Sequence, residues 1–134
     1  MPQDARELKG KTGIRRLVNA TRYSRDGFIQ AFKTEEAFRQ ESILTLLGFI
    51  ALFFIPAAFV LKIAAVFSMV FLLVTELLNS AVEAAIDRIG AEIHPLSKYA
   101  KDAGSCAVLF ALGLCAFVWS TLLWDAFIAP LAAR

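Results

Sequence analysis

The chain has 134 residues, of which 58% are hydrophobic and 19% charged, and its formal net charge is +2. A mean hydropathy of +0.62 is typical of a small membrane protein with a single domain. We expect membrane lipids, and no nucleic acid, as partners of such a chain.

The basic residues are distributed unevenly along the chain. Nine of the 14 Lys and Arg residues lie in residues 1–41 and three more lie in residues 87–102, which leaves Lys62 and Arg134. By the positive-inside rule, the N-terminus and the 87–102 connection face the cytoplasm, and the turn near Lys62 and the C-terminus face the other side. The arrangement predicts three membrane spans.

The N-terminal region is charged and precedes any long apolar run, which argues against a cleavable signal peptide. Residues 1–12 are predicted to be a flexible lead. Residues 13–34 have a basic amphipathic pattern, which predicts a cytoplasmic surface helix that is kinked or interrupted near Gly27. One interpretation is a plain anchor for anionic lipid, and the other is that Tyr23 and Ser24 hold a nucleotide.

Residues 35–124 are predicted to form the membrane domain, and residues 35–41 are a dense charge cluster at its start. The cluster is either a solvated helix start or the source of a carboxylate that joins Glu83 in holding a cation, because Mg²⁺ is typically held by one or two carboxylates plus substrate phosphates. The uncharged run Ser42–Leu61 predicts the first span. We expect Pro56 to end it and Lys62 to mark a short external turn.

The second predicted span runs from Lys62 to about residues 87–90. It places a polar stripe on one side of a helix, formed by Glu76, Asn79, Ser80, Glu83 and Asp87. Glu83 lies roughly 31 Å along the helix from Lys62, at the cytoplasmic interface of a hydrocarbon core about 30 Å thick, and Glu76 lies roughly 10 Å deeper. Ionisable residues inside a membrane are rare, so the stripe indicates a functional site between a soluble substrate and a lipid.

The third predicted span is the uncharged run Ala103–Trp124, followed by an external tail over residues 125–134. Pro95 is expected to begin its helix, and His94 fits a loop residue with a backbone partner better than a metal ligand. Trp119 fits an aromatic belt, although it could instead face a lipid groove. Cys106 and Cys115, nine residues apart, point to opposite helix faces and are predicted to be packing residues.

Phosphate-loop, dinucleotide, protein-kinase, zinc and Ser-His-Asp signatures are all missing from the sequence. Any phosphoryl chemistry must therefore depend on a metal, carboxylates and a few basic groups. Three sequence blocks fit this chemistry and resemble one family: Glu36–Glu41, Glu76–Arg88 and Ala100–Ser105. They are similar, in order and spacing, to the bacterial integral-membrane diacylglycerol kinases, which also include undecaprenol kinases.

The resemblance covers roughly residues 12–124. It implies an all-α homotrimer of three-span subunits, each with an N-terminal amphipathic helix, in the bacterial inner membrane. It also implies composite sites between neighbouring subunits that face the cytoplasm. The implied activity is the phosphorylation of diacylglycerol to phosphatidic acid by ATP with Mg²⁺.

The resemblance further implies residue roles. Glu76 would be the general base on the lipid hydroxyl, supported by Asn79, and Lys101 would offset developing charge. Glu35 and Glu83 would hold Mg²⁺. The nucleotide would contact Arg16, Tyr23, Glu35, Glu83, Glu92, His94, Lys101 and Asp102, and the lipid would contact Arg39, Glu41, Glu76, Ser105 and Trp119. Around Tyr23, the chain has Thr21-Arg22 and Arg25 where many relatives have small residues and a Trp.

Two other functions stay open at this point. One is the same fold acting on undecaprenol. Arg39–Glu41 and Gly104–Ser105 look more like the diacylglycerol kinases of the family than like its undecaprenol kinases. The other is a non-enzymatic membrane protein, such as an ion conduit, with the polar stripe as a pore. Residues 63–69 contribute only Ser68 to such a pore, so the stripe ends half way and favours a cytoplasm-facing site.

Overall fold

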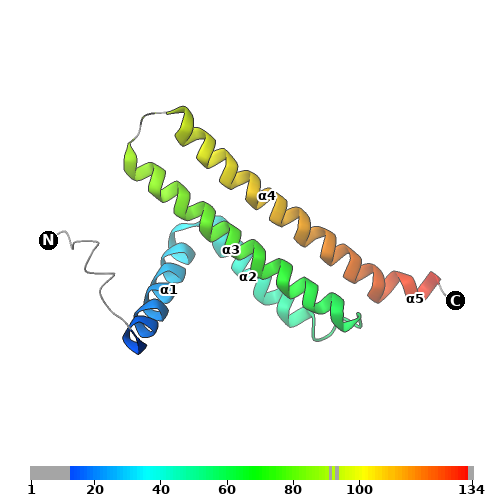
Figure 1. The fold of residues 1–134 in the computed structure, drawn as a ribbon. Helices are drawn as coiled ribbons and strands as arrows, with labels where there is room; N and C mark the ends of the chain where they lie inside the picture. The colour runs from blue at the N-terminus through cyan, green and yellow to red at the C-terminus, as the bar shows by residue number, and fades with distance from the viewer. Residues whose placement is uncertain (1–12, 91, 93, 133–134) are drawn as a thin grey trace.

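The computed structural model describes residues 13–132 except Ala91 and Ile93, so the predicted flexible lead lies outside the described residues. The elements are α1 (Ile14–Thr34), α2 (Glu36–Ala51), α3 (Phe59–Ile89), α4 (Pro95–Leu123), the π-helical turn η2 (Trp124–Ile128) and α5 (Ala129–Ala132) (Figure 1). No strand occurs in this part of the chain. The all-α prediction is confirmed.

The fold is built on an antiparallel pair of long helices, α3 and α4, with α2 alongside the first half of α3 (Figure 1). A small apolar core joins the three helices where α2 ends and α3 begins. Its buried members are Leu52, Ala65, Met69 and Leu122. The hydrogen bond from the Ala58 N–H to Asp125 Oδ2, at 3.0 Å, ties the start of α3 to the η2 turn. These contacts fix the register between α3 and α4 at this end.

Two helical stretches are long and apolar enough to cross a membrane, by length and composition. They are Phe59–Ile89, with 31 residues, and Pro95–Ala132, with 38 residues. Large apolar side chains on them are exposed in the single chain, among them Phe67, Phe110 and Phe117. Exposed apolar surface of this extent is typical of helices that face lipid or another subunit. The chain therefore has the features of a membrane protein.

The predicted first span, Ser42–Leu61, is not a single helix, and this prediction is corrected. α2 stops at Ala51, a tight turn follows, and Pro56 lies in the irregular stretch before α3. The 16 residues of α2 reach about 24 Å, less than the roughly 30 Å of a hydrocarbon core. Lys62 lies in the first turn of α3, its N–H bonded to the Ala58 carbonyl, rather than in the external turn. Three spans therefore remain a prediction.

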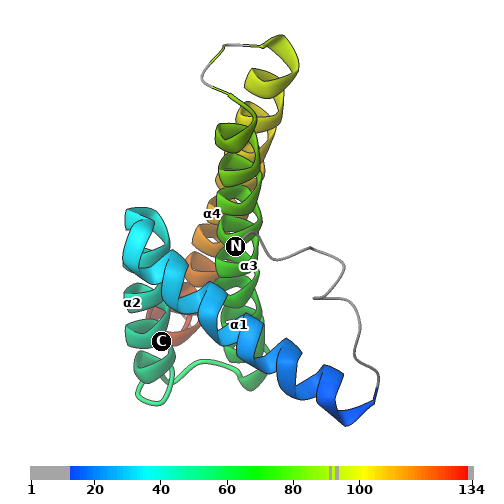
Figure 2. The same ribbon diagram turned by 90° about the vertical axis from the view of Figure 1, so that its left-hand side faces the viewer.

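The surface helix α1 differs from the prediction in one respect: it is continuous through Gly27. Aromatic packing directly after Gly27 helps to hold the helix in place there. Phe28 stacks on Phe32 one turn later and packs edge-on against Phe38 of α2, with ring centroids 5.4 Å apart. α1 thus docks by its last turns, while the rest of the helix extends outside the bundle (Figure 2).

The predictions for Pro95 and His94 are confirmed, and the predicted end of the third span at Trp124 moves. Pro95 begins α4, and His94 caps it by accepting a hydrogen bond from the Leu96 N–H at Nδ1, at 3.2 Å. The two cysteines are unbridged. Helical structure continues past Trp124 through η2 and α5 to Ala132, so most of the expected tail is helical.

Candidate active site

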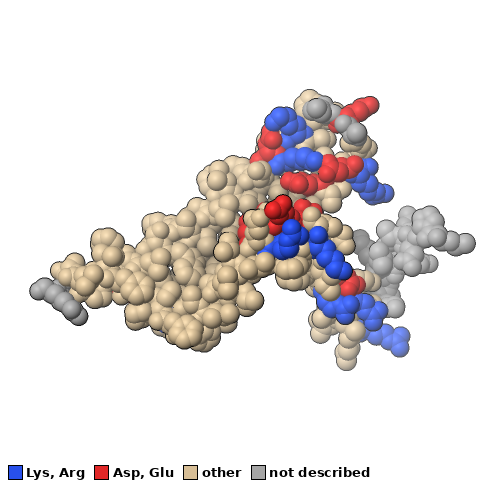
Figure 3. Space-filling model, turned by 180° about the vertical axis from the view of Figure 1, so that it is seen from behind, with Lys and Arg blue, Asp and Glu red and all other residues tan. Residues whose placement is uncertain are grey.

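The charged side chains gather at one end of the molecule. On the face shown in Figure 3, Lys, Arg, Asp and Glu cluster at this end, and the described atoms toward the other end are tan. The charged end includes the last turns of α3, the first turns of α4 and the α3–α4 connection (Figure 1). A soluble, charged substrate is therefore expected to bind there.

Glu76 is the one buried carboxylate among the described residues, with 6% of its surface exposed. It lies on α3 beyond the apolar core, on the side that faces α2. The carboxylates of Glu35, Glu41 and Glu83 are near enough to interact with it electrostatically. The fold thus gathers four of the predicted site residues at the start of α2 and the middle of α3. Glu35 reaches this position because it caps α2 in an extended backbone conformation.

Asn79 links the carboxylate cluster to α4. Its Nδ2 donates a hydrogen bond to Glu83 Oε1 at 3.2 Å, and its Oδ1 is buried with no hydrogen-bond partner in the described chain. A Cβ on Gly104 of α4 would overlap Asn79 Oδ1. A glycine at this position therefore lets α4 approach closely enough to hold the amide, and the amide in turn orients Glu83.

The basic residues at the mouth of the site are paired. The Lys101 ammonium donates a hydrogen bond to Asp87, and Lys98 pairs with Asp102 one turn later on the same helix. The contact with Asp87 holds the Lys101 ammonium beside the last turns of α3. Asp87 is absent from the predicted site residues. Its place on the polar stripe, four residues after Glu83, is the signal that could have found it.

A groove leads from the carboxylate cluster toward the opposite end, between α2, α3 and α4. Its volume is about 530 Å³, within the range of small-molecule sites. Glu41 is its only charged residue, and the rest of its lining is mainly apolar: Leu44, Thr45, Leu47, Gly48, Ala51, Met69, Leu72, Leu112, Cys115, Ala116 and Trp119. The groove joins two predicted lipid-side residues, Glu41 and Trp119.

Glu41 gives this groove a polar end. One of its carboxylate oxygens, Oε2, is buried and has no hydrogen-bond partner in the described chain. The side chain lies just before the uncharged run that begins at Ser42. Burial, followed by repulsion from Glu76, raises the pKa of Glu41 to about 7. Such a group is suited to a hydroxyl ligand, because it can accept or donate a hydrogen bond near neutral pH.

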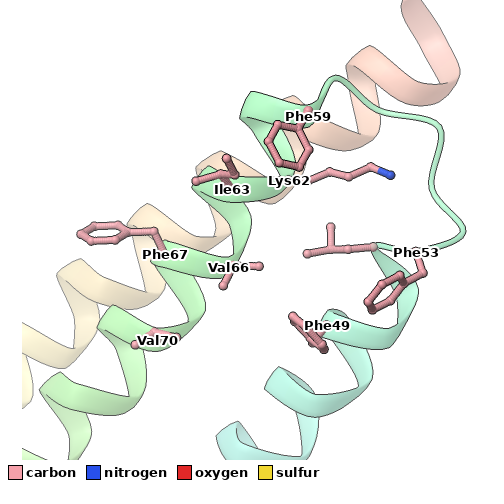
Figure 4. A pocket seen from close by; sticks show the side chains of 9 residues that line it. Phe49, Phe53, Phe59, Lys62, Ile63, Val66, Phe67 and Val70 are labelled. Carbon is pink, nitrogen blue, oxygen red and sulfur yellow. The ribbon is translucent and has the colours of Figure 1, made fainter.

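A second, larger groove of about 640 Å³ lies between the end of α2 and the start of α3 (Figure 4). Aromatic side chains line it, including Phe49, Phe53 and Phe59, and Lys62 is its only charged residue. No carboxylate lines this groove. It is therefore distinct from the candidate active site in spite of its size.

Other predicted residues are not brought together within one chain. Arg16 and Tyr23 are exposed on α1, whose first turns lie far from the α3–α4 connection in both ribbon views (Figures 1 and 2). Glu92 and His94 are exposed in that connection, Ser105 is exposed beside Gly104, and Arg39 is half-buried on α2. Within the described residues, no group of three His, Cys, Asp or Glu side chains is arranged to hold a metal ion.

The described part of the chain is helical, with two membrane-length helices and a buried carboxylate near a mainly apolar groove, and this class of structure is that of a membrane protein. Sequence comparison identifies the family. The sequence model described as "Prokaryotic diacylglycerol kinase" matches residues 22–123, and the chain belongs to this family of lipid kinases.

Curated relatives agree with this assignment. A protein named "Diacylglycerol kinase" from Pseudomonas aeruginosa is 48% identical over 122 residues, which covers 87% of this chain and 94% of the relative. Proteins of the same name from Escherichia coli K12 and Haemophilus influenzae are 40% and 42% identical, over 87% and 84% of this chain and 95% and 96% of their own lengths. The similarity thus extends over nearly the whole length of these relatives.

Proposed function

We propose that this protein transfers the γ-phosphoryl group of ATP to the free hydroxyl of diacylglycerol and forms phosphatidic acid. The observation that carries this proposal is the position of Glu76, which is buried and interacts with Glu41, the carboxylate at the polar end of the apolar groove. A carboxylate at this boundary has access to a lipid hydroxyl from one side and to a phosphate donor from the other. The shared name of the relatives supports the same reaction.

The chain's own residues would divide the work as follows. Glu76 would accept the proton of the lipid hydroxyl, and Glu41 would hold a second polar group of the lipid with its unpaired oxygen. Lys101 would offset negative charge as the phosphoryl group moves. Catalysis of phosphoryl transfer consists mainly of such positioning and charge stabilisation.

The carboxylates near Glu76 fit a magnesium ion. Mg²⁺ prefers oxygen ligands and usually takes one or two carboxylates together with substrate phosphates and water. Glu83, oriented by Asn79, and Glu35, at the cap of α2, would be those carboxylates. A bound Mg²⁺ would neutralise charge on the phosphates and hold them in place.

We propose that the nucleotide site is completed by a neighbouring subunit in a homotrimer. Arg16 and Tyr23 lie on an exposed helix far from Glu92, His94, Lys101 and Asp102 of the same chain, so a neighbour's α1 is the better source of these contacts. The same assembly would cover the polar stripe of α3, which is costly to leave facing lipid. Three spans, with the site toward the cytoplasm of a bacterial inner membrane, complete this proposal.

An assay of phosphate transfer in detergent micelles tests the function. Radiolabelled ATP is supplied with Mg²⁺ and either diacylglycerol or undecaprenol, side by side. We expect labelled phosphatidic acid and little labelled undecaprenyl phosphate. Transfer to undecaprenol alone would assign the protein to the other branch of the fold, and transfer to neither lipid would contradict the proposal.

A further inference from the structure

The groove between α2, α3 and α4 is constricted at Gly48. A Cβ added to this residue would lie 2.8 Å from Met69 Sδ and 3.0 Å from Trp119 Cζ2. Optimal contacts between carbon atoms are about 3.5–4.0 Å, so both side chains would have to move. The backbone does not require glycine here, because Gly48 lies inside α2 and Gly13 is the only described glycine whose φ falls in the left-handed region. Gly48 therefore matters through the space that its missing side chain leaves.

Met69 and Trp119, the side chains displaced at this point, line the groove, and Met69 also borders a smaller cavity of about 250 Å³ between α2 and α3. Met69 is 5% exposed and packs in the core with Leu52, Ala65 and Leu122, so it cannot shift inward without overpacking. Trp119 packs against the same core. Both side chains also line the groove with Gly48. A larger residue at position 48 would therefore reduce the volume of the groove at this depth.

The two ends of the groove differ in the ligand chemistry that they match. Glu41 places a buried, unpaired oxygen at one end, and apolar side chains line the remainder. Gly48 follows Glu41 by seven residues, or about 10 Å along α2. A lipid alcohol fits this asymmetry, with its polar head near Glu41 and its acyl chain extending past Gly48 and Trp119.

We propose that Gly48, together with Met69 and Trp119, determines the length of the acyl chain that the enzyme accepts. The glycine keeps the deep part of the groove open, and the indole of Trp119 forms the wall against which the chain packs. This assignment rests on the proposed function, since the occupant is the lipid substrate itself. It adds a specificity-determining position that is not a polar contact to the lipid head.

The test compares kcat/KM for a short and a long substrate, dihexanoylglycerol and dioleoylglycerol, in the same micelles. Gly48→Ala should lower kcat/KM for the long substrate about tenfold relative to the short one, since one methyl group in an apolar pocket typically has at least this effect. Gly113→Ala is the matched control. It is the same change in α4, at a position where an added Cβ has no neighbour within 4 Å, and the ratio should stay unchanged.

A compensating variant separates specificity from general packing. Gly48→Ala combined with Trp119→Phe should restore part of the use of the long substrate, because phenylalanine lacks the indole atoms that the new methyl would meet and only the contact with Met69 Sδ remains. An equal loss for both substrates, or an unchanged ratio in folded Gly48→Ala protein, would overturn the assignment.

If Gly48→Ala does not fold, Trp119→Phe alone decides: it should shift the ratio toward the long substrate, and an unchanged ratio overturns the assignment. A wild-type protein that phosphorylates neither substrate rejects the proposed function, and this assignment with it.

Discussion

The two halves of α3 differ in what their buried side chains contact. In the first half, Ala65, Ser68, Met69 and Leu72 are buried, and the buried apolar cluster joins this half to α2 and α4. In the second half, Glu76 is the only buried residue, and the polar side chains beyond it contact other polar groups. The first half positions the helix, and the second half contains the residues of the proposed active site. The boundary between them, at Glu76, is where the apolar groove meets the charged end.

The largest effect that this comparison predicts is the loss of the carboxylate at the boundary. Glu76→Gln should lower kcat by about 10²–10⁴-fold, the usual contribution of a general acid–base group, and leave Mg·ATP binding nearly unchanged. Turnover and ATP binding are measured in the same micelles. Glu36→Gln is the control, because Glu36 is exposed and bonds only Gln40 of its own helix. A Glu76→Gln enzyme within tenfold of the wild-type kcat would contradict the role of Glu76.

A change in the apolar core should lower stability and leave turnover unchanged. Leu122 is fully buried against the first half of α3, so Leu122→Ala should lower the free energy of unfolding by about 2–5 kcal/mol. Its kcat at a temperature where the protein is folded should be close to the wild-type value. Detergent unfolding curves and turnover give the two quantities. The neighbouring Leu123, which is 42% exposed, is the control for the same truncation.

The third prediction concerns the support of Glu83. Asn79→Ala removes the hydrogen bond to Glu83, and loss of such a supporting contact typically costs about 10–100-fold in metal affinity or activity. We expect weaker Mg·ATP binding and a proportionate fall in kcat/KM for ATP. Leu78→Ala, at an exposed apolar position of α3 outside the polar stripe, should leave both unchanged. Equal losses in the two variants would show that this part of α3 responds to any truncation.

The smallest effect is expected at the start of the first half. Asp125→Ala leaves the Ala58 N–H without its carboxylate partner and should destabilise the fold by about 0.5–2 kcal/mol, the range for a lost helix cap. Lipid kinase activity of the folded protein should not change, since Asp125 is remote from Glu76. Asp26→Ala, an exposed aspartate on α1, is the comparison and should alter stability by less than about 0.5 kcal/mol. A fall in the kcat of folded Asp125→Ala protein would show that this end also takes part in catalysis.

The sequence was most informative about features that depend on one helix alone. The polar stripe from Glu76 to Asp87 follows from helical spacing, and α3 is one continuous helix as predicted. The start of α4 at Pro95 follows from local capping rules and is confirmed. The sequence was less informative about helix ends that depend on contacts with neighbouring elements. An uncharged run predicted the first span, but the end of α2 at Ala51 is set by the tight turn that leads into α3.

By itself the sequence determined the helix periods, the charge asymmetry and the row of carboxylates, because each is a repeat within one segment. Tertiary structure alone decided which groups meet across helices. Examples are Lys101 with Asp87 and Asn79 against Gly104. Such pairs depend on how far one helix is shifted and rotated against the next. That register is set by close approach at glycines and by the packing of a few core side chains, and neither has a periodic signature in the sequence.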